Sequence, residues 1–294
     1  MRAPSRLLEL EGVQTLLLFA KRKTAQAVTL AHELKARHPE LELLADPDLA
    51  DELGWKQTES LEAMVSRAEL VVVMGGDGTL IHAARALRGR AVPILGVNLG
   101  SLGFMTEIPV ADFLPSLEDV LAGAFRVDSR MKLACRLYRQ GQLLLEDEVL
   151  NDVVINKGAL ARIADHEMTI DGQPVTTYKA DGVIVATPTG STAYALSAGG
   201  PIIHPLVECM VIAPICPHAL TQRPLVVPGA QTVSLRLASD STDVYLTIDG
   251  QIGRALETGD VLEVRRSANR VLLVRNPKKG YFGILRQKLH WGER

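Results

Sequence analysis

A strand pattern followed directly by glycines constrains the fold of this chain more than any other feature of its sequence. Residues 70–74 form a continuous apolar run rich in β-branched side chains, which is typical of a strand buried on both faces of a parallel sheet. Residues 75–79 (Gly-Gly-Asp-Gly-Thr) come next, and residues 79–87 have the pattern of a helix. The glycine-rich loop is therefore predicted at the carboxyl edge of a parallel sheet, where α/β domains bind ligands.

The residue types of this loop point to phosphate chemistry. Three glycines let the backbone approach phosphate oxygens, and the following helix offers unpaired N–H groups and the positive end of its dipole. Thr79 is expected to cap that helix. The loop lacks the lysine and the spacing of a P-loop. Asp77 beside phosphates would bind Mg²⁺, orient a hydroxyl nucleophile or accept its proton; the alternative is a tight turn in which Asp77 has no special role.

The rest of the N-terminal part alternates strand and helix patterns. In residues 24–37 the apolar side chains recur at the spacing of one helical face. Further strands are predicted at 13–20, 41–44 and 92–97, and further helices at 62–68 and 112–121. This alternation predicts an α/β nucleotide-binding domain over residues 1–126, which the C-terminal segment 276–294 is a candidate to complete.

From about residue 127 the helical periodicity fades, and short strands separated by turn signals replace it. Strands are predicted at 233–237, 244–248 and 261–264. Asp-Gly pairs at 171–172 and 249–250 lie between apolar segments, which is the strongest short-range signal for a β-hairpin. Residues 127–275 are therefore predicted to form a β-rich, sandwich-like domain.

Composition excludes several classes of protein. The 294 residues are 47% hydrophobic and 22% charged, which does not fit a disordered chain, a coiled coil or a small disulfide scaffold. A formal charge of -2 gives no strong field for nucleic acid or an anionic membrane, and no run of about 18 apolar residues is present. We expect a cytoplasmic protein that binds neither. Cys135, Cys209 and Cys216 lack metal-site spacing and are expected to be buried thiols.

Two further segments are rich in small and hydroxyl residues. Residues 98–104 resemble a dinucleotide-binding glycine motif with Asn98 in place of the first glycine, but Pro109 interrupts before a long helix can form. Phe104 is available there to stack on a base, or it is a core residue. Residues 186–194 follow an apolar strand, and their hydroxyls can donate to ribose or phosphate oxygens; the alternative is an ordinary helix cap.

The tetrapeptide Ile-Asp-Gly-Gln occurs twice, beginning at residues 170 and 248. Chance together with the turn preference of Asp-Gly is a sufficient explanation for the repetition.

Several of these motifs occur in the order seen in bacterial NAD kinases, the ATP/polyphosphate-NAD kinase family. The shared segments are residues 75–79, 151–152, 181–202 and 248–251, so the resemblance extends from about residue 70 to residue 255. It implies a kinase that transfers the γ-phosphate of ATP, or of another phosphoryl donor, to the 2′-hydroxyl of the adenosine ribose of NAD⁺. It also implies Mg²⁺ that is bound mainly through the nucleotide phosphates, and a homodimer or homotetramer.

The resemblance also implies roles for individual residues. Asp77 corresponds to the catalytic carboxylate that activates the 2′-hydroxyl, and Gly76, Gly78 and Phe104 are expected beside the nucleotide. Asn151 and Asp152 match an Asn–Glu pair that holds the adenine side and ribose, with Asp one methylene shorter than Glu. The remaining residues expected at the dinucleotide, some from a neighbouring subunit, are Arg162, Lys179, Asp181, Thr192, Ala193, Tyr194, Ala195, Leu196, Ser197 and Gln251. The second Ile-Asp-Gly-Gln thus gains a function that the first does not.

Two other functions remain open. A lipid kinase of the related diacylglycerol and sphingosine kinase superfamily would share the glycine-rich loop, but it should present an apolar substrate cleft. A non-catalytic NAD-binding sensor would not need Asp77.

Overall fold

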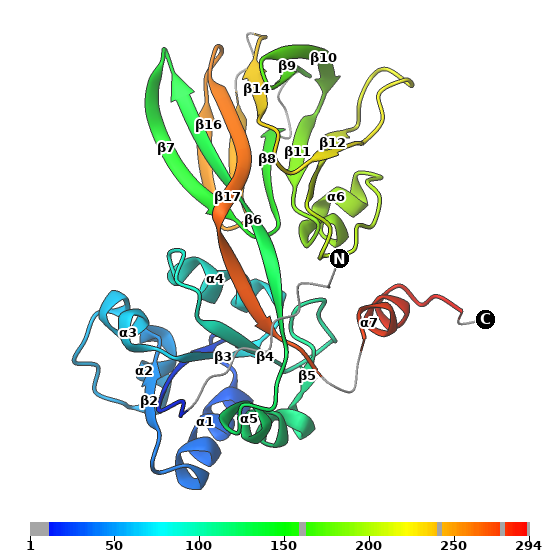
Figure 1. The fold of residues 1–294 in the computed structure, drawn as a ribbon. Helices are drawn as coiled ribbons and strands as arrows, with labels where there is room; N and C mark the ends of the chain where they lie inside the picture. Colours follow the sequence, from blue (N-terminus) through cyan, green and yellow to red (C-terminus); the bar gives the residue numbers. More distant parts are fainter. Residues whose placement is uncertain (1–11, 159–162, 240–242, 277–279, 293–294) are drawn as a thin grey trace. The chain divides into compact units, whose positions relative to one another are not determined.

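The computed structural model describes residues 12–158, 163–239, 243–276 and 280–292. The chain forms two compact units, one of residues 1–129 and 271–294 and one of residues 130–270 (Figure 1). The two units therefore meet at 129/130 and 270/271, whereas the sequence predicted domain boundaries at 126/127 and 275/276.

The first unit is an α/β domain built on a parallel sheet. The strand order is β2-β1-β3-β4, with β5 and the last residues of β17 beside β4. Its elements are β1 (Thr15–Ala20), α1 (Ala25–Arg37), β2 (Glu42–Ala45), α2 (Pro47–Leu53), α3 (Leu61–Arg67), β3 (Leu70–Gly75), α4 (Asp77–Ala86), β4 (Pro93–Asn98), β5 (Ile108–Pro109), η1 (Val110–Asp112), α5 (Phe113–Leu121) and α7 (Tyr281–Lys288).

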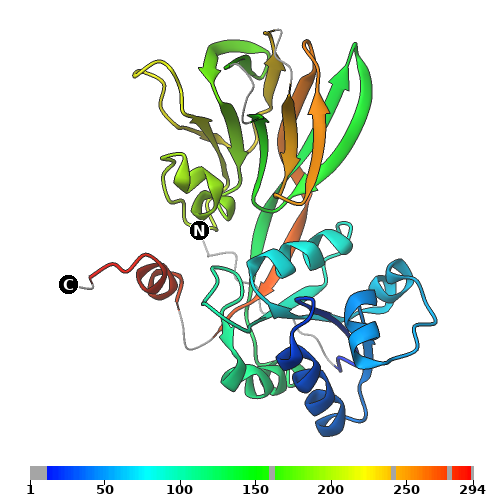
Figure 2. The same cartoon turned by 180° about the vertical axis from the view of Figure 1, so that it is seen from behind.

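Helices cover both faces of this sheet, as a parallel sheet requires. Helices α1 and α5 lie on one face and α4 on the other (Figures 1 and 2). Every residue of β3 and β4 is buried, which confirms the reading of their apolar runs. The apolar stripe of α1 is buried as well, through Ala27, Leu30, Ala31 and Leu34.

Two details of the first unit differ from expectation. Helix α2 was not predicted, although Asp46 followed by Pro47 at the first helical position is a recognised start signal. Helix α4 begins at Asp77 rather than Thr79, so Gly76 is the residue at the N-cap and Thr79 lies inside the helix. The prediction that Thr79 caps the helix is therefore wrong.

The second unit is the predicted β-sandwich. One sheet has the order β10-β9-β14-β17-β6-β7, and the other is antiparallel with the order β13-β12-β11-β8-β15-β16. Its elements are β6 (Val127–Arg139), β7 (Gln142–Val149), β8 (Asp152–Lys157), β9 (Ala164–Ile170), β10 (Gln173–Ala180), β11 (Gly182–Ala186), η2 (Gly190–Thr192), α6 (Tyr194–Ser197), β12 (Cys209–Ile215), β13 (Leu225–Pro228), β14 (Val233–Leu237), β15 (Val244–Ile248), β16 (Ile252–Leu256) and β17 (Val261–Val274).

The core of the sandwich is formed by inward side chains of both sheets. Met168 and Leu235 come from the first sheet, and Val153 and Ile212 from the second. The outer face of the second sheet packs against α6 through a smaller cluster that includes Val154 and Ala195. Because successive strand residues point to opposite faces, Asp152, Val154 and Asn156 share that outer face.

Both predicted Asp-Gly hairpins are present, one between β9 and β10 and one between β15 and β16. Cys135 and Cys209 are buried as expected, but Cys216 is exposed, so the prediction of a buried thiol is wrong at that position. No helix within the described residues has the length and apolar character needed to cross a membrane.

Candidate active site

The glycine-rich loop joins the end of β3 to the start of α4, as the sequence predicts. Its glycines have different roles. A Cβ atom at Gly75 would lie 2.5 Å from the Thr79 hydroxyl oxygen, so this position packs against its own helix. Gly76 and Gly78 face open space, because a Cβ at either would meet nothing within 4 Å. The space that a side chain would take at these two glycines is therefore unfilled, next to a helix N-terminus, where an anion is favoured.

Asp77 is held by a short segment that follows β4. Its Oδ2 accepts a hydrogen bond from the Phe104 N–H at 2.8 Å, and its Oδ1 accepts from the N–H groups of Met105 and Thr106, both at 3.0 Å. The Thr106 hydroxyl also donates to Oδ1 at 3.2 Å. A carboxylate has about four acceptor positions, two on each oxygen. Oδ2, with one donor, is thus the oxygen that can still accept a hydroxyl proton.

The segment around Asp77 is shaped by Asn98 and Gly103. The Asn98 side chain donates to the Ser101 carbonyl at 2.6 Å and accepts from the Gly100 N–H at 2.8 Å, which closes the turn after β4. A Cβ at Gly103 would lie 2.2 Å from Asp77 Oδ1, so only glycine leaves room for the carboxylate in this position.

Phe104 is half-buried, and its ring lies 5.7 Å from Nζ of Lys288 in α7. That separation is within the range of a cation–π contact. The ring is thus a partly accessible surface beside Asp77 rather than a core side chain.

The described residues do not supply a metal site of their own. Within them, no group of three His, Cys, Asp or Glu side chains is arranged to hold a metal ion. Both oxygens of Asp77 already accept hydrogen bonds from the protein.

The second unit carries a pocket of about 360 Å³ on the outer face of its second sheet. Four residues that were predicted to bind the dinucleotide meet there: Asn151, Asp152, Ala193 and Tyr194. The lining is completed by Val154, Asn156, Thr247, Asp249 and Gly250. The strand alternation of β8 and the pairing of Thr247 with Val154 bring these side chains to one face.

Two neighbouring carboxyl groups give this pocket its electrostatic character. Asp152 is only 5% exposed. Burial, and secondly the charge of Asp249, raise the pKa of Asp152 from 3.8 to about 7. The Asp249 carboxylate is stabilised by the backbone N–H groups of residues 150–152, at 2.7–3.1 Å. The side-chain Oδ1 of Asn151 is buried and accepts no hydrogen bond from any described group.

The hydroxyl-rich segment forms the turn η2 and the short helix α6 next to this pocket. Thr192 is half-buried and donates to the Thr189 carbonyl, and Ala195 is fully buried. Leu196 is half-buried and Ser197 exposed. Of this predicted group, only Ala193 and Tyr194 line the pocket.

The other predicted residues lie outside the pocket lining. Lys179 is exposed at the end of β10, and Asp181 follows it, 3.6 Å from the ammonium of Lys157. Gln251 is exposed in the turn after β15. Arg162 lies outside the described residues.

Three residues of the pocket lining, Val154, Asn156 and Thr247, were not singled out from the sequence, and Asp249 and Gly250 were named only as a hairpin turn and as members of the shared segment 248–251. Two signals could have found most of them. The alternation of Asp152, Val154 and Asn156 along β8 follows from a period of two. Asp249 and Gly250 directly precede the predicted Gln251.

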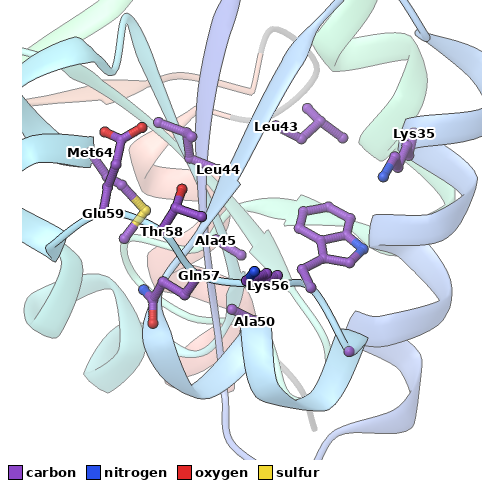
Figure 3. Close-up of a pocket in the computed structure, with 12 residues that line it drawn as sticks. Lys35, Leu43, Leu44, Ala45, Ala50, Lys56, Gln57, Thr58, Glu59 and Met64 are labelled. Carbon is purple, nitrogen blue, oxygen red and sulfur yellow. The ribbon is translucent and has the colours of Figure 1, made fainter.

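A second pocket, of about 430 Å³, lies in the first unit beside β2 (Figure 3). Lys35 and Trp55 are among its lining residues, and Nζ of Lys35 lies 4.7 Å from the Trp55 ring centre. Its one carboxylate, Glu59, is paired with Arg67. None of the predicted site residues lines this pocket.

The chain is similar to known proteins over nearly its whole length. Residues 14–125 match the model of the ATP-NAD kinase N-terminal domain, and residues 150–276 match that of the ATP-NAD kinase C-terminal domain. It is 53% identical to the NAD kinase of Geobacter metallireducens, over 85% of this chain and 88% of the relative. It is 50% identical to the NAD kinase of Geotalea daltonii, over 94% and 98%.

Two solved structures share the fold. Yeast NADH kinase complexed with NADH superposes with a TM-score of 0.91 and is 26% identical, over 99% of this chain and 92% of that one. An NAD kinase from Archaeoglobus fulgidus in complex with ATP gives a TM-score of 0.74 at 26% identity, over 93% and 99%.

Proposed function

The chain belongs to the NAD kinase family, and we propose that Asp77 is the residue that activates the acceptor hydroxyl in its reaction. The protein transfers the γ-phosphate of ATP to the 2′-hydroxyl of the adenosine ribose of NAD⁺ and produces NADP⁺. This family assignment favours NAD kinase activity over a lipid kinase and over a non-catalytic sensor.

One observation supports the role of Asp77 above all others: its carboxylate is fixed at the start of α4 with Oδ2 able to accept another hydrogen bond. In the proposed step, Oδ2 accepts the proton of the ribose 2′-hydroxyl. The hydroxyl oxygen forms a bond to the γ-phosphorus, and the bond from that phosphorus to the β–γ bridging oxygen breaks. ADP leaves with the electron pair.

No side chain occupies the space at Gly76 and Gly78 beside the α4 N-terminus, and we assign this surface to nucleotide phosphates. Mg²⁺ bound to those phosphates would offset their negative charge. Phe104 offers its half-buried ring to the same nucleotide.

Asn151 and Asp152 are assigned to the adenosine side of NAD⁺, and Ala193 and Tyr194 line the same pocket. The buried acceptor Oδ1 of Asn151 supports this assignment, because a ligand donor would satisfy it. Contacts from Arg162, Lys179, Asp181, Thr192, Ala195, Leu196, Ser197 and Gln251 remain predictions. So do the cytoplasmic location and the homodimeric or homotetrameric assembly.

The role of Asp77 is tested by following NADP⁺ formation from NAD⁺, ATP and Mg²⁺. Asp77→Asn should lower kcat about 100- to 10,000-fold, since the variant cannot accept the proton. Asp119→Asn is the matched control, because Asp119 is an exposed carboxylate on α5 of the same unit. Full activity of Asp77→Asn would overturn the assignment.

A further inference from the structure

The two Ile-Asp-Gly-Gln segments each begin a hairpin loop, in different sheets. Residues 171–172 form a two-residue loop between the paired Ile170 and Gln173, whereas residues 249–251 form a three-residue loop between the paired Ile248 and Ile252. Asp171 and Asp249 both have left-handed backbone angles, with φ of 50° and 47°, and each is followed by a left-handed glycine. The Asp171 N–H donates to the Thr232 carbonyl at 2.9 Å, and the Asp249 N–H donates to the Asp152 carbonyl at 2.9 Å. Each aspartate thus fastens its hairpin to a neighbouring segment.

The two side chains differ in what they hold. The Asp171 carboxylate accepts one further hydrogen bond, from the Thr232 N–H at 2.8 Å. The Asp249 carboxylate accepts from three consecutive N–H groups: Leu150 at 2.9 Å, Asn151 at 2.7 Å and Asp152 at 3.1 Å. Bonds of this kind to an ionised acceptor are stronger than neutral ones.

The same bend of residues 150–152 is also held through its carbonyl groups. The Thr187 N–H donates to the Asn151 carbonyl at 2.8 Å, and the Thr187 hydroxyl donates to the Leu150 carbonyl at 2.6 Å. Gly190 packs so closely that a Cβ there would lie 2.1 Å from the Asn151 carbonyl oxygen. Thr187 therefore holds the bend by donating to its carbonyl groups, and Asp249 holds it by accepting from its N–H groups.

We propose that Asp249 is a positioning residue of the NAD⁺ site: its carboxylate gathers the N–H groups of residues 150–152 and so sets where Asn151 and Asp152 stand. This rests on the proposed function, in which that pair contacts NAD⁺. Without the carboxylate the three N–H groups lose their common acceptor, and the bend relaxes beside the pocket. NAD⁺ binding then weakens, whereas ATP use does not.

The first hairpin supplies a matched control. Asp249→Ala and Asp171→Ala place alanine at two backbone positions with similar positive φ angles, 47° and 50°, so the strain that arises from φ is comparable in both. We expect Asp249→Ala to raise the KM for NAD⁺ about 10- to 100-fold, the effect of a small misplacement of binding groups. The KM for ATP should stay within about twofold, as should both KM values in Asp171→Ala. Equal KM values for NAD⁺ in the two variants would overturn the proposal.

Asp249→Asn keeps the proposal testable if the alanine variant does not fold. Asparagine tolerates the left-handed turn and retains one acceptor oxygen. An intermediate rise in the KM for NAD⁺ is expected, and a KM equal to that of the unmodified protein would contradict the inference.

Asp152→Ala separates this inference from the proposed function. If Asp152→Ala leaves the KM for NAD⁺ unchanged, the assignment of the pair to NAD⁺ fails. If Asp152→Ala raises that KM and the Asp249 variants do not, only the role of Asp249 fails.

Discussion

The buried carboxyl of Asp152 should make the protein less stable as pH rises. An unfolded chain ionises this group near pH 3.8, whereas burial and the charge of Asp249 raise the folded pKa to about 7. Between these values the folded state binds the extra proton. The free energy of unfolding therefore falls with rising pH over this range and levels off above pH 7.

The size of the effect follows from the two pKa values. At about 1.36 kcal/mol per pH unit, Asp152 lowers the free energy of unfolding by about 2 to 3 kcal/mol between pH 5 and pH 8. Asp152→Asn removes the titrating group without changing the shape of the side chain. The variant should therefore gain about 2 to 3 kcal/mol relative to the unmodified protein as pH rises from 5 to 8.

Urea unfolding of both proteins at pH 5, 6, 7 and 8, without nucleotide, measures this difference. Other titrating groups are present in both proteins and cancel in the comparison. Thermal unfolding should show the same trend, with a relative Tm gain of roughly 5–10 °C. Parallel pH profiles for the two proteins would refute the reasoning, because Asp152 would then titrate alike in the folded and unfolded states.

Three further predictions concern single positions. Gly103→Ala should lower kcat about 100-fold by displacing the Asp77 carboxylate, whereas Gly100→Ala, which meets open space in the same loop, should keep its activity; equal kinetics would contradict the first effect. Burial lowers the pKa of His166 to about 4, so His166 by itself should contribute a loss of about 2 kcal/mol of stability as pH falls from 8 to 5, because it protonates in the unfolded chain only. His166→Leu should lack this loss in urea unfolding, and an NMR titration of the His166 ring with a midpoint above pH 6 would refute it. Gly190→Ala should cost about 1–3 kcal/mol, because its Cβ would lie 2.1 Å from a backbone oxygen, and an unchanged Tm would speak against that clash.

Much of the fold could be predicted because local patterns and tertiary packing agree. The apolar run of β3 and the stripe of α1 are buried as their periods indicate, and both Asp-Gly turns close hairpins. Helix α2 was missed because its seven residues carry only a short apolar pattern. The start of α4 was misplaced because a glycine rather than a hydroxyl residue stands at its N-cap.

The candidate site divides in the same way. Asp77 stands out in the sequence because it lies among glycines directly after a buried strand, whereas Asn151 and Asp152 were identified through the resemblance to NAD kinases. Two sets of hydrogen bonds in the site cannot be predicted from residue spacing. The N–H groups of residues 104–106 lie 27–29 residues from Asp77, to which they donate. The N–H groups of residues 150–152 lie 97–99 residues from Asp249, to which they donate.

The sequence by itself determined the α/β and β-sandwich units, the place of the glycine-rich loop and the two hairpins, because these depend on period, turn chemistry and neighbours along the chain. Only the tertiary structure decided which oxygen of Asp77 can accept a further hydrogen bond, and which of the two Ile-Asp-Gly-Gln segments supports the pocket. Asp171 and Asp249 have the same immediate neighbours in sequence and similar positive φ angles. They differ in the backbone N–H groups that the sheets bring to their carboxylates. Those N–H groups belong to residues far away in the chain, so the tetrapeptide alone does not reveal them.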